Sequence, residues 1–373
     1  MPRVAILNSR QSKTPICTDE WVRNTAAAVT HACEIEGWDI VSSIGMVTWD
    51  FVTWLAGSSN ALLHLVIPKA TDGGGSEIEH SIVHEFDLAP DRIRWHCVDV
   101  APDDAERKNW WPQRDRMVLD LADILLPVSI RPGGALEQLI RGSELRAEVD
   151  RQFEVSSYNP QSHHLRDLVD AARLSSEIQR WEPEWLIHWT RTCHGPWPGE
   201  TQSDFFKDFM KPSDGYCRSG FATLRRILKE QLIRASAWRI GGKQAMVALT
   251  ELSPVESLPL MRWRPRWSNW AFEPYGIAIR RDWVKRLGIR PVYYVSADQW
   301  RKVPSEDRPF SHGAGKKDPI WPAEREWRCV GDLNLGAIPT EALRIIVRDG
   351  AEAAVVGELS DAPVHAFMEG ARV

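Results

Sequence analysis

Paired cysteines and long apolar runs are both missing from this chain. Its six cysteines are scattered, with no Cys-x-x-Cys pair, which argues against a zinc ribbon or a disulfide framework and favours a reducing compartment. No apolar run approaches the roughly 18–20 residues that cross a bilayer. A strand is expected directly from Val4, with no signal peptide before it. We therefore expect a cytoplasmic protein without a membrane segment or a metal centre.

An excess of positive charge is missing as well. The formal net charge is −5, so a cationic surface over the whole chain, typical of nucleic-acid binders, is not expected, although local patches can still bind nucleic acid. The length of 373 residues exceeds what one hydrophobic core usually supports and favours two domains.

The first part of the chain has the pattern of an α/β domain. A helix that ends before Gly37 and a Pro-Gly-Gly turn at 132–134 lie between apolar strand segments. Strands alternating with helices predict a Rossmann-like parallel sheet with right-handed crossovers. The expected strands are 4–7, 39–43, 62–67 and 122–128, and the expected helices are 19–36 and one that begins at 135.

Two features of this part suggest a phosphate site. Gly133 and Gly134 precede the helix that begins at 135, and backbone N–H groups at a helix N-terminus favour an anion. Arg114 and Arg116 lie shortly before the last strand and would add a guanidinium clamp.

Four short segments resemble the superfamily that joins the DNA-processing protein DprA to the LOG-type phosphoribohydrolases. Residues 8–10 (Asn-Ser-Arg) resemble its Gly-Ser-Arg turn, 42–50 its glycine-rich Ser…Asp segment, 114–116 (Arg-Asp-Arg) its Arg-Asn-Arg, and 132–139 its Pro-Gly-Gly…Glu loop. The resemblance covers about residues 1–145. It implies a nucleotide ligand held by Ser9, Arg10, Gly45, Arg114, Arg116, Gly133, Gly134 and Glu137.

The departures from this family bear on catalysis. Asn8 and Ser43 replace expected glycines, and the phosphate loop is shortened. Gln138 occupies the position of the catalytic glutamate, and an amide cannot ionise. Hydrolysis would then require Glu137 as a substitute carboxylate, so nucleotide binding is favoured over phosphoribohydrolase activity.

The composition changes after the first domain. Residues 141–180 are charged and are expected to be helical; from 184 onward, short aromatic and β-branched runs predict an α+β domain with a mostly antiparallel sheet. The expected organisation is a nucleotide-binding domain at 1–150, a helical connector at 151–183 and an effector domain at 184–373. The 19 tryptophans lie mostly in the later part and form either its core or a cleft for a flat ring.

The later domain resembles the AbiGi-like and DUF2971-like domains of bacterial abortive-infection proteins. The matching segments occur in the family's order, at 249–252, 270–279, 291–295 and 324–328. This resemblance implies an anti-phage effector, a toxin that acts on the infected cell.

The same segments look like an ADP-ribosyltransferase fold, which implies NAD or an NAD-derived nucleotide as cofactor. His188 and Arg191 would hold NAD, and Thr250 and Tyr275 would lie near the nicotinamide ribose. Residues two apart on an extended segment share a side, so Glu324 and Glu326 could both face one cleft. One would stabilise the glycosyl cation and the other would activate the acceptor. Each of these residues also has a structural interpretation, such as ion pairing or packing in the core.

Other interpretations stay open. Arg262–Trp267 alternates cations with aromatics, as nucleic-acid-binding segments do, and is also typical of a solvated loop. His80 and His84 share a helical face, but a surface helix is the simpler explanation. The competing functions are a DprA-like single-stranded DNA-binding protein and a LOG-like phosphoribohydrolase. The expected partners are a nucleotide ligand, a nucleic-acid or protein acceptor and, by resemblance, a second copy of the chain.

Overall fold

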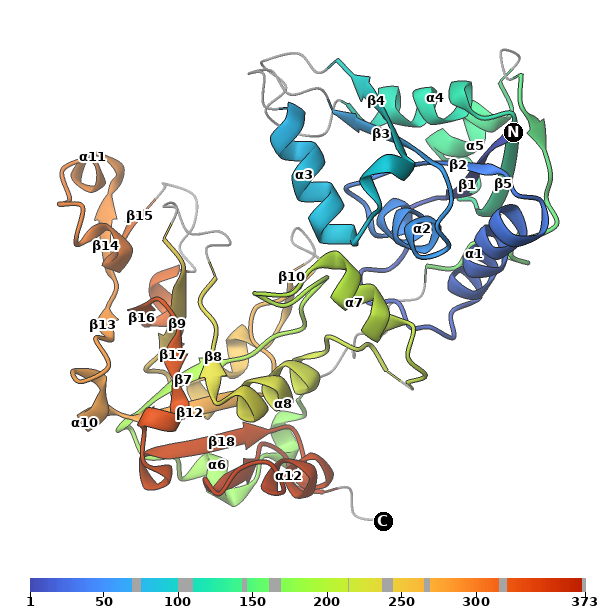
Figure 1. Cartoon of the computed structure of the whole chain (residues 1–373). Coiled ribbons are helices and arrows are strands. Elements are labelled where there is room, and N and C mark those ends of the chain that lie inside the picture. Colours follow the sequence, from blue (N-terminus) through green and yellow to red (C-terminus); the bar gives the residue numbers. More distant parts are fainter. Residues whose placement is uncertain are drawn as a thin grey trace. The chain divides into compact units, whose positions relative to one another are not determined.

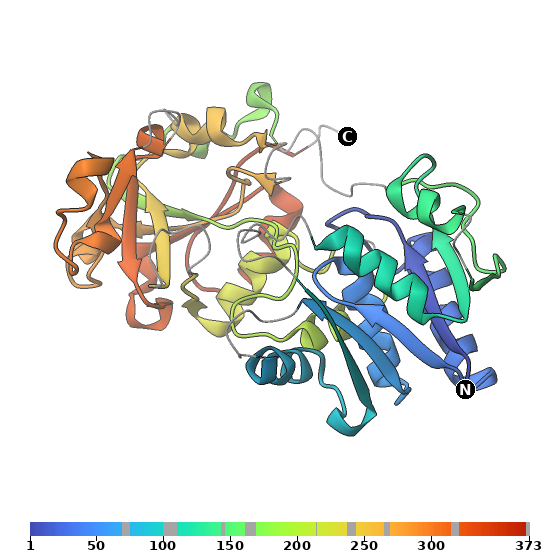
Figure 2. The same cartoon turned by 90° about the horizontal axis from the view of Figure 1, so that it is seen from above.

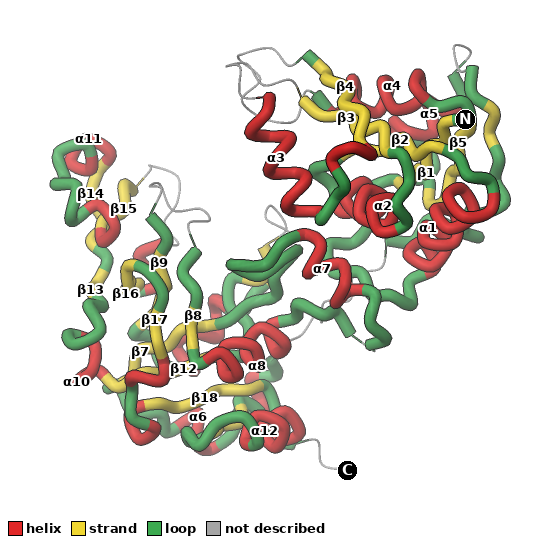
Figure 3. The backbone as a smooth tube through the Cα atoms, in the orientation of Figure 1, coloured by secondary structure: helices red, strands yellow, loops and turns green. Residues whose placement is uncertain are grey.

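The computed structural model describes the chain except residues 69–74, 100–109, 143–145, 161–168, 214, 237–243, 265–268, 315–320 and 371–373. The chain forms two compact units (Figures 1 and 3). Unit 1 comprises Met1–His164 and Gly195–Cys217, and unit 2 comprises Leu165–His194 and Arg218–Val373. Both units are therefore discontinuous in the sequence. No helix within the described ranges is long and apolar enough to cross a membrane.

Unit 1 is built on a six-stranded sheet in the order β4-β3-β2-β1-β5-β6. All neighbouring pairs are parallel, which confirms the predicted Rossmann-like fold. The strands are β1 (Arg3–Asn8), β2 (Asp39–Ser43), β3 (Leu63–Pro68), β4 (Ile93–Val98), β5 (Ile124–Ser129) and β6 (Glu148–Val149). The helices are α1 (Glu20–Thr30), α2 (Val47–Ser58), α3 (Gly75–Phe86), α4 (Trp111–Leu121) and α5 (Ala135–Ile140).

Helices cover both faces of this sheet (Figure 2). Successive residues of a strand point to opposite faces, and β1 is buried along almost its whole length. Val4 and Ile6 pack with residues of α1 and α2, whereas Ala5 and Leu7 pack with residues of α4. A strand buried on both faces is typical of a parallel sheet.

A segment from the later part of the sequence completes the core of unit 1. Helix α7 (Gln202–Phe209) begins with a capping box between Thr201 and Asp204. Phe206 is 1% exposed, and its ring lies 5.5 Å from Phe51 and 5.6 Å from Trp54 of α2. The core of unit 1 therefore depends on residues that follow the first strand of unit 2.

Unit 2 is built on a seven-stranded sheet in the order β13-β16-β9-β7-β12-β18-β19. Its pairs are antiparallel except β18–β19, as predicted. The strands are β7 (Trp185–Trp189), β9 (Met246–Thr250), β12 (Gly276–Arg280), β13 (Arg290–Pro291), β16 (Glu326–Val330), β18 (Leu343–Val347) and β19 (Val364–Ala366).

The two faces of this second sheet have different cores. Leu186, Val247 and Ile277 pack with residues of α8 (Gly220–Glu230). On β7 itself, Trp185 and Trp189 belong to a separate aromatic cluster. The buried indoles of this cluster agree with the interpretation of tryptophans as core residues.

The remaining elements are short. Three two-stranded ribbons are formed by β8 (Leu232–Ile233) with β17 (Leu333–Asn334), β10 (Trp263–Arg264) with β11 (Asn269–Trp270), and β14 (Tyr293–Ser296) with β15 (Ser311–Ala314). The short helices are α6 (Ser176–Gln179), α9 (Pro254–Ser257), α10 (Arg281–Val284), α11 (Ala297–Trp300) and α12 (Gly350–Gly357). The expected long helix over 141–180 is wrong: its described part contains only β6, one 3-10 turn and α6.

Candidate functional site

The carboxyl edge of the sheet in unit 1 has a topological switch point. The chain leads from β1 outward through β2 and β3 to β4 and then crosses to β5 on the other side of β1, so the strand order reverses at β1. Ligands in open α/β sheets bind outside the carboxyl ends of strands at such a point. Ser9, which follows β1, receives a hydrogen bond on Oγ from the N–H of Arg131 at 2.9 Å, and its own N–H donates to Ser129 O at 2.8 Å. The structure thus brings Ser9 to the loop after β5.

The turn after β2 is fixed by an aspartate. Gly45 has φ +90°, a conformation that favours glycine, and its N–H donates to Asp50 at 2.8 Å. Burial raises the pKa of the Asp50 carboxyl to about 7, although the Gly45 N–H and the charge of Arg114 both lower it. Asp50 therefore changes charge near neutral pH, within the predicted ligand site.

Arg114 is held inside the protein rather than extended toward solvent. It is 3% exposed and lies between the rings of Trp49 and Trp110, at 5.4 and 5.3 Å. Its Nε donates to Asp115 at 2.9 Å and its Nη1 to Ile44 O at 3.4 Å. Arg114 thus supports the walls of the site.

The other two arginines predicted for this site are exposed. Arg10 lies over the ring of Trp111 at 5.6 Å, and its carbonyl accepts a hydrogen bond from Tyr158. Arg116 is on the outer face of α4. These side chains lie nearer to solvent than Arg114 does.

The Pro-Gly-Gly turn holds a carboxylate of the protein itself. Gly133 has φ +69°, and its N–H donates to Glu137 at 2.7 Å. Glu137 also pairs with Arg141 at 2.8 Å. A phosphate at this amide would have to displace the carboxylate. Gly134 is the N-cap of α5, which has six residues, and Gln138 on that helix is exposed.

Three polar groups near the carboxyl edge lack a hydrogen-bond partner among the described residues. They are Asn8 Oδ1 at the end of β1 and, in the first turn of α2, Thr48 Oγ1 and Trp49 Nε1. Each residue is at most 2% exposed, and buried polar groups are normally satisfied. Sequence reasoning missed Thr48 and Trp49 because the segment 44–50 reads as a turn rather than as a helix start.

In unit 2, His188 and Arg191 differ in exposure. The ring of His188 donates from Nδ1 to Ala248 O at 2.8 Å, and burial lowers the pKa of His188 to about 4. Its imidazole is therefore neutral at pH 7. Arg191 is exposed and interacts electrostatically with Glu324, Glu273 and Arg264.

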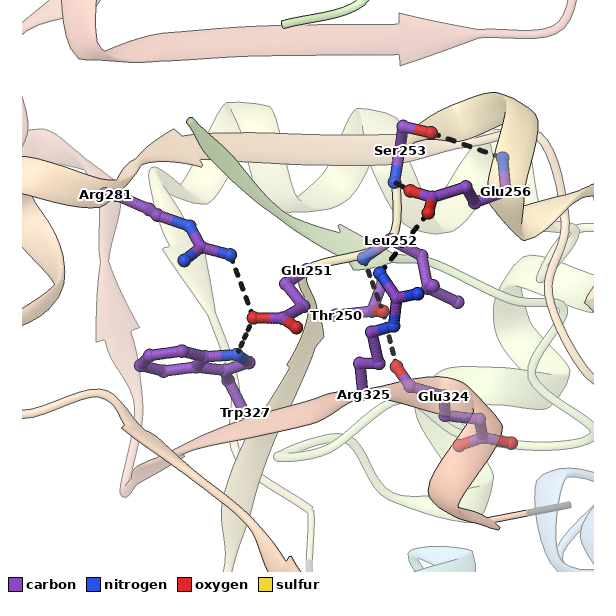
Figure 4. Close-up of polar contacts among 9 residues, drawn as sticks. All are labelled: Thr250, Glu251, Leu252, Ser253, Glu256, Arg281, Glu324, Arg325 and Trp327. Atoms are coloured by element: carbon purple, nitrogen blue, oxygen red, sulfur yellow. Dashed lines mark hydrogen bonds and ion pairs between the residues drawn. The ribbon is translucent and has the colours of Figure 1, made fainter. Parts of the chain in front are cut away.

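Thr250 at the end of β9 lies beside Glu324, which precedes β16 (Figure 4), and Glu326 at the start of β16 is the register partner of Thr250. The hydroxyl of Thr250 donates to Glu324 O at 2.5 Å and accepts from Leu252 N–H at 3.1 Å. Glu324 ends a 3-10 turn, Trp321–Glu324, and Arg325 has φ +41°. The expectation of an extended Glu-x-Glu segment is therefore wrong, because the strand begins only at Glu326.

The two carboxylates have different partners. Glu324 pairs with Arg264 at 3.0 Å, and burial raises its pKa while Arg264 lowers it. Glu326 forms a two-pronged ion pair with Arg328 at 2.8 and 2.9 Å. Burial and the charges of Glu326 and Glu324 raise the pKa of Tyr294, so its hydroxyl lies in the field of both.

Tyr275 does not join this group through its hydroxyl. The side chain is 5% exposed, and the hydroxyl donates to Glu352 of α12 at 3.1 Å. Ser253, at the end of the β9 segment, caps α9 through a capping box with Glu256. Both side chains have structural partners.

Sequence reasoning missed the site roles of Arg264 and Tyr294. Arg264 was seen as part of the mixed segment 262–267, of which 265–268 lie outside the described residues. Tyr294 was seen as a strand residue, and only the three-dimensional structure places it near the glutamates. On α3, His80 and His84 are exposed, and no group of three or more metal-ligand side chains is found within the described ranges.

Comparison with known proteins adds little to this picture. No family model matches the chain, and no curated protein matches it. One similar solved structure is DNA processing protein A from Helicobacter pylori, described for its single-stranded DNA binding mode. It is 16% identical, the match covers 41% of this chain and 67% of that chain, and the TM-score is 0.28. At this level of similarity the comparison carries no argument about function, so the fold assignment rests on the observed sheet topology.

Proposed function

We propose that unit 1 binds a nucleotide at the carboxyl edge of its parallel sheet. The observation that carries this proposal is the set of unpartnered buried polar groups, Asn8 Oδ1, Thr48 Oγ1 and Trp49 Nε1, near a topological switch point. A ligand would reach these atoms only by opening the packing around them, because each atom is buried in the structure. Ser9, Arg10, Gly45 and Gly133 lie on the loops at this edge, and Arg116 lies on α4 with Arg114, which supports the wall.

The test uses a substitution that should not harm folding. Thr48→Val keeps the shape of the side chain and removes a hydroxyl without a described partner, so the protein should be as stable as the wild type or more stable. We expect at least about tenfold weaker binding of AMP or ADP-ribose, measured by calorimetry. The matched control is Thr53→Val in the same helix, where the hydroxyl donates to Ser43 O at 2.8 Å; it should lower stability and leave affinity unchanged. Equal affinity in Thr48→Val and wild type would contradict the proposal.

We further propose that unit 2 is an NAD-consuming, ADP-ribosyltransferase-like effector. The supporting observation is the group formed by Arg191, Arg264, Glu324 and Tyr294. In the reaction, the bond between ribose C1 and the nicotinamide nitrogen breaks and its electron pair leaves with nicotinamide. Water or an acceptor nucleophile then adds to C1 and loses a proton. A carboxylate near C1 would stabilise the positive charge that develops there.

Release of nicotinamide from NAD, with and without cell lysate as a source of acceptors, tests this second proposal. Tyr275→Phe is a suitable control, because the Tyr275 hydroxyl is bound to Glu352; its activity should equal that of the wild type. Absence of nicotinamide release under both conditions would remove NAD consumption from the proposal. The role in phage defence rests on the sequence resemblance and would be tested by plaque counts in cells that carry the protein.

Two alternatives give different results in the same assays. A DprA-like function predicts salt-sensitive binding of single-stranded oligonucleotides, which a mobility shift at low salt would reveal. A LOG-like function predicts release of free base from nucleoside monophosphates. The geometry disfavours that reaction, because Glu137 is engaged by Gly133 and Arg141 and Gln138 cannot ionise.

A further inference from the structure

The paired glutamates of unit 2 have different environments, and this difference assigns their roles. We propose that Glu324 is the carboxylate that meets the ligand, that Thr250 and Arg325 position it, and that Glu326 belongs to the scaffold. The assignment rests on the proposed NAD chemistry of unit 2. It specifies which of two neighbouring carboxylates faces the ribose.

Glu326 is committed to a buried arginine. Arg328 is 3% exposed; its Nε and Nη2 donate to Glu326 at 2.8 and 2.9 Å, and its Nη1 donates to Pro309 O at 2.8 Å. Removing one partner of a buried ion pair leaves the other charge uncompensated and destabilises the fold. Glu326 therefore has the environment of a structural ion pair.

Glu324 is held differently. One carboxylate oxygen accepts from Arg264 at 3.0 Å, and the two side chains are 16% and 20% exposed. Arg191, an exposed residue, is a second positive charge in electrostatic range. The Glu326 side chain is 10% exposed, so the two carboxylates differ less in exposure than in their partners: Glu324 pairs with a half-buried arginine, and Glu326 pairs with a fully buried one.

The turn that carries Glu324 is tied to the end of β9 at three points. The Thr250 hydroxyl holds the Glu324 carbonyl, the Glu251 N–H donates to Arg325 O at 3.3 Å, and Arg325 pairs with Glu256 at 3.3 Å. Figure 4 shows the Glu324 side chain directed away from these attachments.

The backbone conformation of Arg325 indicates that this turn is functionally constrained. Its φ of +41° lies in the left-handed region, which is unfavourable for a residue with a long side chain. Such strain persists only where the surroundings impose it, and it concentrates at functional sites. The Thr250 and Glu251 contacts hold the backbone of this turn, from which the Glu324 side chain projects.

The test compares full-length Glu324→Gln and Glu326→Gln in two assays. We expect Glu326→Gln to lower the thermal unfolding midpoint by about 5–10 °C, because Arg328 loses its charged partner. Glu324→Gln should keep the wild-type midpoint and lose about 100-fold or more of nicotinamide release. A midpoint loss in Glu324→Gln as large as in Glu326→Gln, or full activity in Glu324→Gln, overturns the assignment.

Thr250 provides the test of positioning. Thr250→Val removes the hydroxyl that holds the turn and should lower kcat about tenfold with KM unchanged, whereas Thr250→Ser keeps the hydroxyl and should restore kcat. An equal loss in both variants would show that packing at Thr250, not its hydrogen bond, matters. If the wild type itself releases no nicotinamide, the NAD proposal fails and the assignment of Glu324 to the ribose fails with it, whereas the unfolding midpoints still test whether Glu326 belongs to the scaffold.

Discussion

Asp50 shows how burial changes a single residue. Its ordinary pKa is 3.8, and in the folded protein burial raises the pKa to about 7. Between about pH 4 and 7 the folded state keeps a proton that the unfolded chain releases, so the free energy of unfolding falls as the pH rises through this range. Above pH 7 both states are ionised and the decrease stops.

We therefore predict that Asp50→Asn stabilises the protein at pH 8 and has little effect at pH 4. Asparagine can still accept the Gly45 N–H and never becomes charged, so the gain at pH 8 should be up to about 4 kcal/mol, the equivalent of a shift of about three pKa units. Urea denaturation at both pH values measures it. A gain that is the same at pH 4 and 8 would show that the carboxyl does not titrate in this range.

Some residues of a site can be recognised in the sequence from a local motif, whereas others come together only in the folded structure. Ser9 and Gly133 were predicted to hold one ligand because both lie in short segments that resemble motifs of the DprA and LOG superfamily. The pairing of Arg264 with Glu324 joins positions 60 residues apart, and no local pattern signals it. The same holds for Thr48 Oγ1, whose lack of a described partner is visible only in three dimensions.

At the scale of elements, regular apolar segments were predicted well. The expected strand at 39–43 coincides with β2, and that at 62–67 differs from β3 by one residue at each end. Strand β4 was not predicted, because Arg94 and His96 interrupt its apolar pattern. The segment 141–180 was wrongly expected to be helical because its charges suit helix surfaces. Residues 151–160 form turns, bends and irregular backbone, and Tyr158 and Phe153 bind this stretch to other parts of unit 1.

Two histidines that face each other on the paired strands β3 and β4 should make the stability of the protein depend on pH. His64 and His96 share a hydrogen bond of 3.0 Å. Burial lowers the pKa of each ring below 6.5. At His64 the charges of Arg3 and Arg94 also lower the pKa, whereas Asp39 raises it. The unfolded chain takes up protons near pH 6.5 that the folded pair resists. The contribution of this pair to the free energy of unfolding should therefore fall as the pH drops below about 6.5, opposite in direction to the contribution of Asp50.

Urea denaturation at pH 7.5, 6.5 and 5.5 checks this pH dependence. His96→Gln removes one titrating ring and should flatten the decrease. If the stability of His96→Gln changes with pH as much as that of the wild type, other groups cause the pH dependence.

One aromatic residue of α7 should contribute strongly to the stability of unit 1. Phe206→Ala should destabilise unit 1 by about 3–5 kcal/mol, because the side chain is 1% exposed among Phe51, Trp54 and Phe209 and its removal leaves a cavity. Chemical denaturation followed by tryptophan fluorescence measures the loss. The adjacent Lys207→Ala removes an exposed side chain and should change stability by less than about 0.5 kcal/mol.

At the scale of the whole molecule, the sequence indicates two domains but not that each is discontinuous. Composition changes near 184, where unit 2 begins its sheet with β7, yet Gly195–Cys217 belongs to unit 1. Nothing in the composition of this segment separates it from its neighbours. Its phenylalanines are explained only by the core that they complete.

This arrangement predicts the behaviour of a fragment cut at the apparent boundary. Residues 1–183 lack Phe205, Phe206 and Phe209, and would expose Phe51 and Trp54 of α2. We expect this fragment to bind the dye ANS and to unfold without a sharp transition, in contrast to the full chain. A fragment with cooperative unfolding and no dye binding would show that α7 is dispensable.

The interleaving of the two units also limits how such a protein can be assembled during evolution. The chain passes between the units at 164–165, 194–195 and 217–218. A gene fusion that joins one intact module to another needs a single junction, whereas replacing unit 1 of this protein requires two simultaneous exchanges. The two units are therefore expected to be inherited together, so that a change of ligand in one and of substrate in the other arises by point substitution rather than by swapping modules.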